Sequence, residues 1–297
     1  MKKFLLWLAI ILILMFIISL FSSRHKDENK KNNSVVNQEH SNIDEVNNDN
    51  INNDHDSNDD VIKETYISYS KIPDLELPDD NDILRYKAFT LSYNEEYEQA
   101  EWVAYILTCS ETQGKIKRTN RFKEDKRIIT GSAKNEDYRK SGYDRGHLIP
   151  AADNSWDKIA MEESFLYSNM SPQDPSFNRG IWKELEEQVR DWTCNYDSLY
   201  IVTGPIFKGN MKRIGPNRVA VPPYYYKALL YYSQNKTEAI AFILPNEKSN
   251  KEIYQYVVTI DSLEKEIGFD LFYKLNDDFE NTIESRYNLN FWFRNLN

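Results

Sequence analysis

The pattern of apolar and polar positions first separates an N-terminal segment from the rest of the 297-residue chain. Residues 4–21 hold nothing more polar than Ser19, and a helix of that length would span roughly 27 Å, close to the hydrocarbon thickness of a bilayer. Lys2 and Lys3 precede this segment. It is either an uncleaved membrane anchor or a cleaved signal peptide, and we assign residues 1–23 to it. Its length and the lack of an A-x-A-like cleavage site favour the anchor.

The next segment, residues 24–62, has no aromatic residue. It contains eleven Asn, ten acidic and four basic residues, so it cannot bury enough apolar surface to fold, and we predict a disordered tether. The basic residues that follow the apolar segment oppose a cytoplasmic N-terminus on the positive-inside rule, whereas Lys2 and Lys3 favour one. A short tail before a long domain is the usual export arrangement. We therefore expect the domain to lie outside the cytoplasm, held at the membrane, or secreted if the segment is cleaved.

Residues 63–297 show no repeat and no second linker, and we interpret them as one domain. The apolar and β-branched runs predict strands at 86–93, 102–108, 199–203, 224–232 and 239–244. Helical periodicity predicts helices at 159–167, 181–192 and 261–267, the last one capped by Asp261 and ended by Gly268. Because the neighbouring strands lack crossover helices, the sheet should be mostly antiparallel, which gives a mixed α+β fold.

Composition and charge exclude several classes of protein. Two cysteines and four histidines are too few for a multi-cysteine zinc or iron–sulfur scaffold, and a net charge of −10 argues against a protein that is basic throughout. Locally, however, residues 115–127 carry a net charge of +5, and four more basic residues lie between 208 and 218. These stretches either form a groove for phosphates or are two solvated loops. Whether Cys109 and Cys194 form a disulfide outside the cytoplasm is left open.

Two motifs carry the candidate chemistry. The first is D-R-G-H at residues 144–147, which contains the single histidine of the predicted domain. The second, N-x-x-P-Q-x-x-x-x-N-x-G-x-W-x-x-L-E, extends from Asn169 to Glu186. A spacing of four predicts that one face of a helix opened near Gly180 carries the side chains of Asn178, Trp182, Glu186 and Arg190. The alternative is a solvated helix with a Glu186–Arg190 ion pair.

With these motifs in this order, residues 85–295 resemble the DNA/RNA non-specific endonucleases of the ββα-metal type. The run E-Q-A-E-W-V-A-Y at 98–105 resembles a subgroup that is common in bacterial members. The resemblance implies a central antiparallel sheet flanked by helices, which agrees with the α+β interpretation. It also implies hydrolysis of phosphodiester bonds in nucleic acids.

The resemblance and the residue chemistry agree on the main roles. His147 is the one side chain of the domain with an ordinary pKa near neutrality, so it is the natural general base. The resemblance implies a hydrated Mg²⁺, or Mn²⁺ in its place, on Asn178, with Glu186 orienting the metal's waters. Arg145 would bind phosphate oxygens, and its alternative role is a salt bridge to Asp144.

Five further residues are given roles, of which Arg121 is assigned to catalysis. The resemblance places a second phosphate-binding arginine near Arg121, and Arg190 is a weaker candidate for the same role. Asn169 and Gln173 would either shape the loop or hold His147 and waters, and a purely structural role is an equal alternative. Asp144 is expected to orient the backbone or Arg145 rather than to bind metal.

The sequence thus predicts a Mg²⁺-dependent endonuclease that cleaves DNA and RNA without sequence preference. One alternative is a cell-surface phosphodiesterase that acts on small phosphoesters, and another is an anchored protein that binds DNA without cutting it. The sequence leaves open the preference for DNA or RNA, the biological role, the oligomeric state and any protein inhibitor.

Overall fold

The computed structural model describes residues 83–293, apart from 234 and 274. The predicted anchor and tether lie outside the described residues. Among the residues that are described, no helix is both long and apolar enough to span a membrane.

A seven-stranded sheet forms the centre of the domain, and every strand pair in it is antiparallel. In spatial order its strands are β1 (Ile83–Arg85), β2 (Thr90–Asn94), β3 (Gln99–Thr108), β6 (Ser198–Ile206), β9 (Tyr224–Tyr232), β10 (Thr237–Pro245) and β11 (Val257–Val258). The predicted mixed α+β fold with an antiparallel sheet is confirmed.

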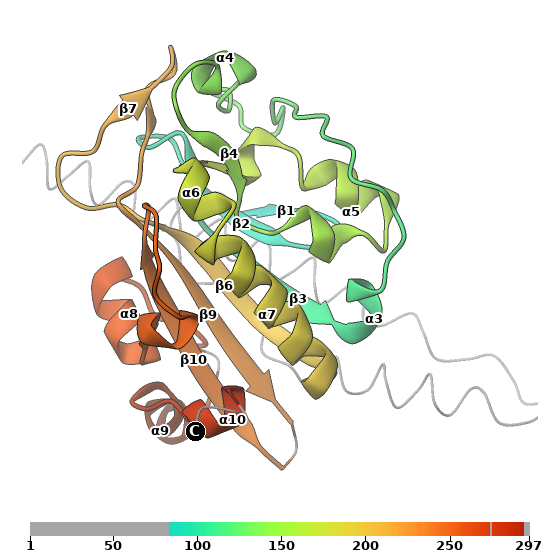
Figure 1. Ribbon diagram of the computed structural model, residues 1–297, viewed down its shortest axis with the longest axis vertical. Helices are drawn as coiled ribbons and strands as arrows, with labels where there is room; N and C mark the ends of the chain where they lie inside the picture. The colour runs from blue at the N-terminus through green and yellow to red at the C-terminus, as the bar shows by residue number, and fades with distance from the viewer. Residues whose placement is uncertain (1–82, 234, 274, 294–297) are drawn as a thin grey trace, which may run out of the picture. The chain divides into compact units, whose positions relative to one another are not determined.

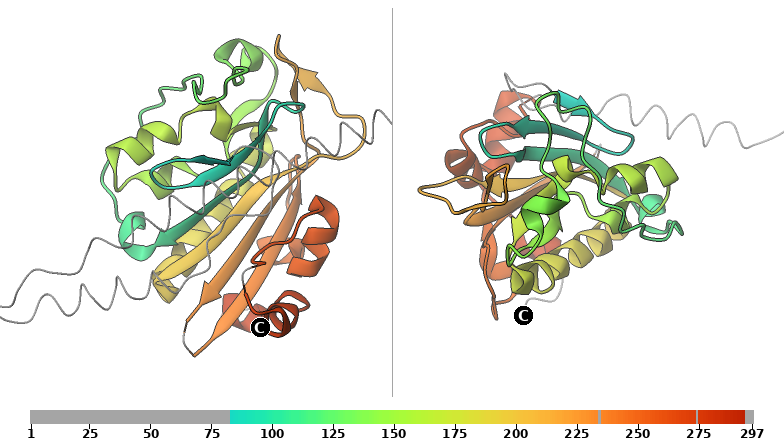
Figure 2. Two further views of the ribbon diagram at one scale, coloured as in Figure 1. Left: turned by 180° about the vertical axis from the view of Figure 1, so that it is seen from behind. Right: turned by 90° about the horizontal axis from the view of Figure 1, so that it is seen from above.

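Helices cover both faces of this sheet (Figures 1 and 2). Helix α7 (Ile181–Tyr196) packs on one face, because its buried side chains recur at helical spacing and meet alternate residues of the central strands. Helices α8 (Ile260–Ile267) and α9 (Asp277–Glu284) pack on the other face, against the intervening residues. The short α10 (Leu289–Trp292) adds Trp292 to the face that α7 covers. The alternation of strand side chains therefore gives the domain two hydrophobic cores.

The remaining elements are short. They are α3 (Cys109–Thr112), α4 (Asn135–Tyr138), β4 (Asp144–His147), η1 (Ala151–Asn154), α5 (Lys158–Glu163), η2 (Tyr167–Asn169), β5 (Met170–Gln173), α6 (Pro175–Asn178), β7 (Arg213–Ile214), β8 (Val219–Ala220) and η3 (Ile253–Tyr256). Strands β4 and β5 form their own antiparallel pair, and α6 leads from β5 into α7. Together β4, β5 and the following helices make the ββα unit that carries both sequence motifs.

Four of the five predicted strands have different bounds in the structure. Strand β3 begins three residues before the predicted start, and β10 extends beyond both predicted ends. The predicted strand 86–93 is interrupted, because the backbone NH of Tyr86 donates to the carbonyl of Phe89 at 2.8 Å and closes a turn between β1 and β2. Strand β6 continues beyond Thr203, where the sequence predicted its end. The strand can continue because residue 204 is a glycine. A Cβ at this position would lie only 2.3 Å from the carbonyl oxygen of Glu101 in the neighbouring strand.

The helix predictions are correct in type and inexact at the ends. Helix α5 ends at Glu163, four residues before the predicted end, and the chain continues into the turn of η2. Helix α8 is capped by Thr259, whose hydroxyl accepts from the backbone NH of Ser262 at 3.2 Å. The predicted cap, Asp261, is instead within the first turn, where its charge favours the helix dipole.

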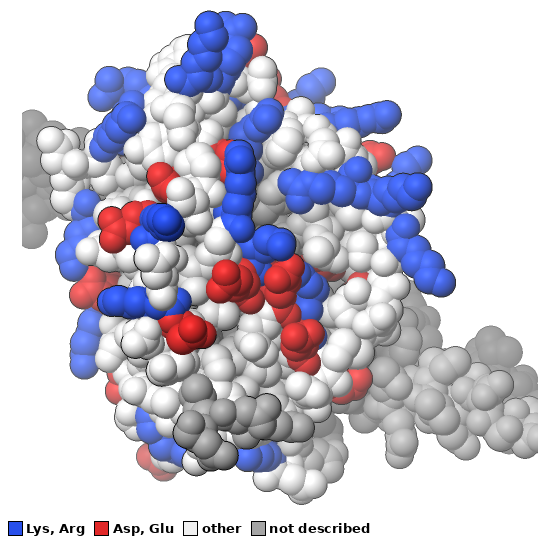
Figure 3. All heavy atoms as spheres, viewed as in Figure 1, with Lys and Arg blue, Asp and Glu red and all other residues white. Residues whose placement is uncertain are grey.

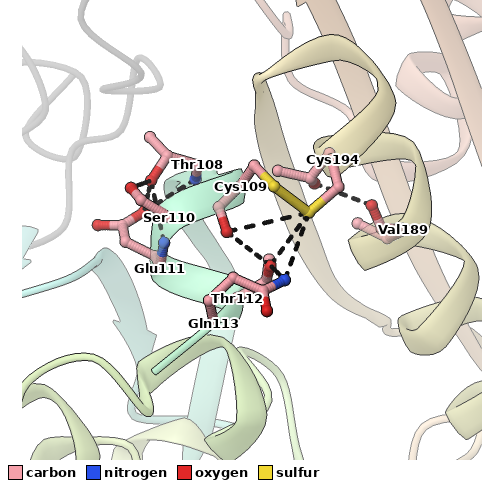
Figure 4. Close-up of a disulfide and its surroundings, with 9 residues drawn as sticks. Thr108, Cys109, Ser110, Glu111, Thr112, Gln113, Val189 and Cys194 are labelled. Carbon is pink, nitrogen blue, oxygen red and sulfur yellow. Dashed lines mark hydrogen bonds between the residues drawn. A yellow bond between two sulfur atoms is a disulfide. The ribbon is translucent and has the colours of Figure 1, made fainter. Parts of the chain in front are cut away.

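The pairing of the two cysteines, which the sequence left open, is settled by a disulfide between Cys109 and Cys194 (Figure 4). It joins the first residue of α3, just after β3, to the last turn of α7, with the two Cα atoms 4.4 Å apart. The side chain of Thr108 caps α3, and the hydroxyl of Thr112 lies 3.3 Å from Sγ of Cys194 in the bridge. The disulfide thus ties the C-terminal end of α7 to the sheet that it covers.

Candidate active site

The D-R-G-H motif forms strand β4, which places His147 at the base of a cavity. Gly146 is required there because a Cβ would lie 2.1 Å from Oε1 of Gln173, which fills the space below it. The His147 ring is only 7% exposed and packs edge-on against Phe165, with ring centroids 4.9 Å apart. Phe122 lies on another side, at 5.9 Å.

This environment sets the charge of the imidazole. Burial, together with the positive charges of Arg118 and Arg145, lowers the pKa of His147 to about 3. Its Nε2 atom is buried and has no hydrogen-bond partner among the described residues. His147 is therefore neutral at physiological pH and able to accept a proton, as a general base must be.

Asn178 is the last residue of α6, not a residue of α7 as the spacing predicted. Gly180 separates the two helices, and Trp182 is buried in the core rather than lying along the cavity. The Nδ2 atom of Asn178 donates to Asp144 at 3.0 Å, and Arg179 binds both oxygens of the same carboxylate. Asp144 therefore pairs with Arg179 and not with Arg145. Its hydrogen bond also fixes the amide group of Asn178, and the Oδ1 atom of Asn178 remains available to bind a ligand.

Helix α7 contributes Glu186 and Arg190 to one wall of the cavity. Arg190 donates to Asp153 of η1 at 3.0 Å, so the alternative interpretation, a solvated helix with a Glu186–Arg190 pair, is not what the structure shows. The side chain of Tyr105 donates to the same aspartate at 3.1 Å. Burial raises the pKa of Glu186, and the positive charge of Lys227 opposes that rise.

Lys227 is a residue that the sequence analysis missed. It is fully buried in β9, with its ammonium 4.9 Å from the centre of the Trp182 ring, and burial lowers its pKa. A lysine in the middle of the apolar run 224–232 was a signal that could have identified it. Its charge lies beneath the cavity wall formed by Glu186.

The cavity has a volume of about 380 Å³ and collects most of the predicted site residues. Its walls are formed by Arg118, Arg145, His147, Pro150, Ala151, Ala152, Asn178, Arg179, Lys183, Glu186, Glu187 and Arg190. On the face shown in Figure 3, Lys and Arg side chains gather over the upper part, where α4, β4 and α5 lie. The cavity therefore combines one neutral imidazole and one fixed amide with several guanidinium groups.

Arg145 lies in this cavity without a bond to Asp144. Its guanidinium stacks 4.1 Å from the centre of the Phe122 ring and donates to Asn135 at 3.1 Å. The alternative role as a salt-bridge partner of Asp144 is therefore not observed. Arg145 lines the same cavity as His147, and its positive charge acts on that imidazole.

The residue of the basic stretch 115–127 that lines the cavity is Arg118, not the predicted Arg121. Arg118 lies 5.0 Å from the Phe165 ring and is held by Asn120, to which its Nε donates at 2.7 Å. Arg121 is exposed and is not among the residues that line the cavity. The irregular chain between α3 and α4 has no periodicity, so the run of basic residues did not indicate which arginine points inward.

Asn169 and Gln173 do not line the cavity; they support the strands and loops that form it. The side chain of Asn169 accepts from the NH of Ile149 at 3.0 Å and donates to its carbonyl at 3.1 Å, which fixes the chain two residues after His147. Gln173 is fully buried beneath Gly146. Of the alternatives left open for this pair, the structure shows the structural role.

Comparison with known proteins agrees with this site. The family model for DNA/RNA non-specific endonucleases matches residues 68–278. A nuclease of Syncephalastrum racemosum is 35% identical over 221 residues, 66% of this chain and 69% of that protein. Human mitochondrial endonuclease G is 34% identical over 197 residues, 61% of this chain and 66% of that protein. A crystal structure of the EndoG/EndoGI complex aligns with a TM-score of 0.66 and 30% identity, over 70% of this chain and 92% of that one.

The fold and the site thus define a nuclease, a hydrolase of phosphodiester bonds with a ββα-metal fold. The chain belongs to the DNA/RNA non-specific endonuclease family. This membership confirms the predicted resemblance and favours cleavage of nucleic acids over both alternatives, the small-phosphoester enzyme and the non-cleaving DNA-binding protein.

Proposed function

We propose that this chain is a Mg²⁺-dependent endonuclease that cleaves both DNA and RNA without sequence preference, with Mn²⁺ as a possible substitute ion. The observation that carries the proposal is the neutral His147, which lies in one cavity with the fixed amide of Asn178 and the guanidinium groups of Arg118 and Arg145. A base, an oxygen ligand and two phosphate-binding groups are the components that phosphodiester hydrolysis needs.

The donor set of the cavity fits Mg²⁺. Asp144 occupies the amide nitrogen of Asn178, so the neutral Oδ1 is the atom free to bind a cation. A single amide oxygen would be a poor site for zinc, whereas Mg²⁺ keeps most of its waters and needs few protein ligands. The carboxylate of Glu186 lines the same cavity and would accept hydrogen bonds from those waters. When bound, the ion would neutralise phosphate charge and stabilise the leaving oxygen.

The protein's own side chains would act as follows. Neutral His147 accepts the proton of the attacking water, a step that typically contributes about 10²–10⁴ in rate. Arg118 and Arg145 bind the non-bridging oxygens of the phosphate and oppose the charge that grows on them in the transition state. Since both arginines are stacked on phenylalanine rings, their guanidinium groups are already oriented before substrate binds.

The lack of sequence preference follows from what surrounds the cavity. The basic stretch 115–127 and the cavity arginines offer contacts to phosphates, which every nucleic acid shares. The sequence contains no motif that resembles a base-reading module. Contacts with phosphate alone would serve DNA and RNA equally.

We also propose that the nuclease domain acts outside the cytoplasm, linked to the membrane through residues 1–62. The apolar segment and its polar tether support this location. The Cys109–Cys194 disulfide supports it independently, since such bonds persist mainly in oxidising compartments. Digestion of the domain by protease added to intact cells that express the full chain would test the proposal, and complete protection in intact cells would contradict it.

The cleavage proposal is tested with the full chain, purified in detergent, on plasmid DNA and on single-stranded RNA. We expect fragmentation of both substrates in Mg²⁺, no cleavage in EDTA, and a loss of at least about 10²-fold in His147→Ala. Asn178→Ala should raise the Mg²⁺ concentration needed for half-maximal rate or abolish turnover. Asn250→Ala, a change of an exposed loop asparagine, is the matched control and should behave as the parent does. Full activity of His147→Ala would refute the mechanism.

A further inference from the structure

A cluster of acidic side chains lies where α8 meets α9, on the face of the sheet opposite α7. Asp261 and Glu264 come from α8, Asp270 from the loop that follows, and Glu280 and Glu284 from α9. The nuclease cavity, in contrast, lies on the α7 side of the sheet and is lined by His147, Asn178 and Glu186. The cluster is therefore separate from the nuclease site, and the nuclease mechanism makes no use of it.

The spacing of the carboxylates suits a shared ion. One oxygen from each of Asp261, Glu264 and Glu284 lies within 4.8 Å of the other two, and the same holds for the set of Asp270, Glu280 and Glu284. Two oxygens that bind one Ca²⁺ at about 2.4 Å can be no more than about 4.8 Å apart. Both sets meet this limit, and Glu284 is common to both.

Glu284 provides a second observation that points to a ligand. Its side chain is only 4% exposed, yet its Oε1 has no hydrogen-bond partner among the described residues. The preceding residue, Ile283, is packed in the hydrophobic core. A carboxylate buried in such a place normally has a partner, because an unpaired buried charge is costly. An oxygen of Glu284 lies within 4.8 Å of oxygens of other carboxylates, and these cannot donate a hydrogen bond when they are ionised.

Electrostatics disfavour an ionised cluster without a cation. Burial, together with the negative charges of Glu264, Glu280, Asp270 and Asp261, raises the pKa of Glu284 to about 9. Glu264 retains one defined partner, since its Oε1 accepts from the backbone NH of Leu271 at 2.8 Å. That bond fixes the chain between the two helices and leaves the second oxygen of Glu264 for another ligand.

We propose that the α8–α9 junction binds a divalent cation, Ca²⁺ in preference to Mg²⁺, through Asp261, Glu264 and Glu284, with Asp270 and Glu280 at its border. Ca²⁺ takes six to eight oxygen ligands in flexible geometry, which a dense set of carboxylates provides, whereas Mg²⁺ requires a near-ideal octahedron. The bound ion joins α8 to α9 and holds both helices on the sheet. It has a structural role and is distinct from the ion of the nuclease site.

The experiment measures thermal unfolding of the full chain in the Asn178→Ala background, which weakens metal binding at the nuclease site. The protein is first treated with EDTA to remove bound ions. Ca²⁺ is then titrated into this protein at a constant excess of Mg²⁺. At a concentration of Ca²⁺ about 100-fold above Kd, we expect Tm to rise by roughly 5–10 °C. Equilibrium dialysis with Ca²⁺ should give one ion bound per chain.

Glu284→Gln should abolish both the Tm rise and the bound ion. In EDTA, the same variant should be at least as stable as the parent, because a neutral amide replaces a carboxyl group whose ionised form is disfavoured there. Asp278→Asn is the matched control: it removes a charge from an exposed position on the same helix, outside both sets, and should keep the full Ca²⁺ response. If Glu284→Gln does not fold, Asp261→Asn is judged by the same criteria. No Tm rise in the parent, or an equal rise in the variants, would overturn the proposal.

Discussion

The loss of stability on acidification tests whether His147 is neutral in the folded protein. Burial and two neighbouring arginines lower its pKa to about 3, against about 6.5 for an ordinary histidine. Below pH 6.5, the unfolded chain takes up a proton at this position that the native chain does not bind. The free energy of unfolding therefore falls by about 1.4 kcal/mol for each pH unit between 6.5 and the native pKa. Stability that is complete above pH 6.5 is thus about 2 kcal/mol lower at pH 5.0.

The assay compares Tm of the parent and of His147→Asn at pH 7.5 and pH 5.0. The carboxylates titrate in both proteins, so the difference between the two pH-induced losses isolates the histidine. For a domain of this size, about 2 kcal/mol corresponds to roughly 4–8 °C, and we expect the parent to lose that much more than the variant. Equal losses in the two proteins would show that His147 is not held neutral by burial, and the reasoning would fail.

The same pKa makes a prediction for catalysis. Because kcat/KM reports the ionisation of the free enzyme, its acid limb should lie well below pH 6.5 on a plasmid substrate. A decline centred near pH 6.5 would mean that the base titrates as an exposed histidine does.

Three further predictions concern other parts of the domain. Arg118→Ala should lower kcat by about 10²-fold or more, whereas Arg121→Ala should have a much smaller effect, and plasmid-cleavage kinetics with the order reversed would contradict the cavity geometry. Gly146→Ala should destabilise the fold by about 1–3 kcal/mol, because a Cβ has no space there, and an unchanged midpoint of urea unfolding would contradict this. Breaking the disulfide with Cys109→Ser and Cys194→Ser should cost up to about 4–5 kcal/mol for a separation of 85 residues, measured by urea unfolding with the reduced parent as a control.

The periodic parts of the fold were predictable from sequence. The strands at 102–108 and 224–232 and the helix at 181–192 were found because apolar residues recur with the period of each element. The end of β6 was not found, since Gly204 and Pro205 normally stop a strand. They continue it here because the neighbouring strand approaches the backbone closely, which only the three-dimensional structure shows.

The site was predictable as far as motifs extend. His147 was identified as the single histidine of the domain, and Asn178 and Glu186 were identified through the family resemblance of the second motif. The structure brings all three to one cavity. Arg118 was missed because it lies in an irregular segment, where packing on Phe165 rather than any local pattern selects the inward-pointing residue. The partner of Asp144 is likewise a tertiary property that sequence spacing cannot supply.

The pairing of β4 with β5 has a consequence for how these motifs can change over time. Asp144 orients Asn178, and Gly146 leaves room for Gln173, so each residue of one motif sets the effect of a substitution in the other. Contacting residues of this kind commonly show interaction energies of about 0.5–3 kcal/mol in double-mutant cycles. The two motifs are therefore expected to be inherited as a single unit. Transplanting one motif alone into another protein would transfer neither the packing between the two strands nor the catalytic arrangement.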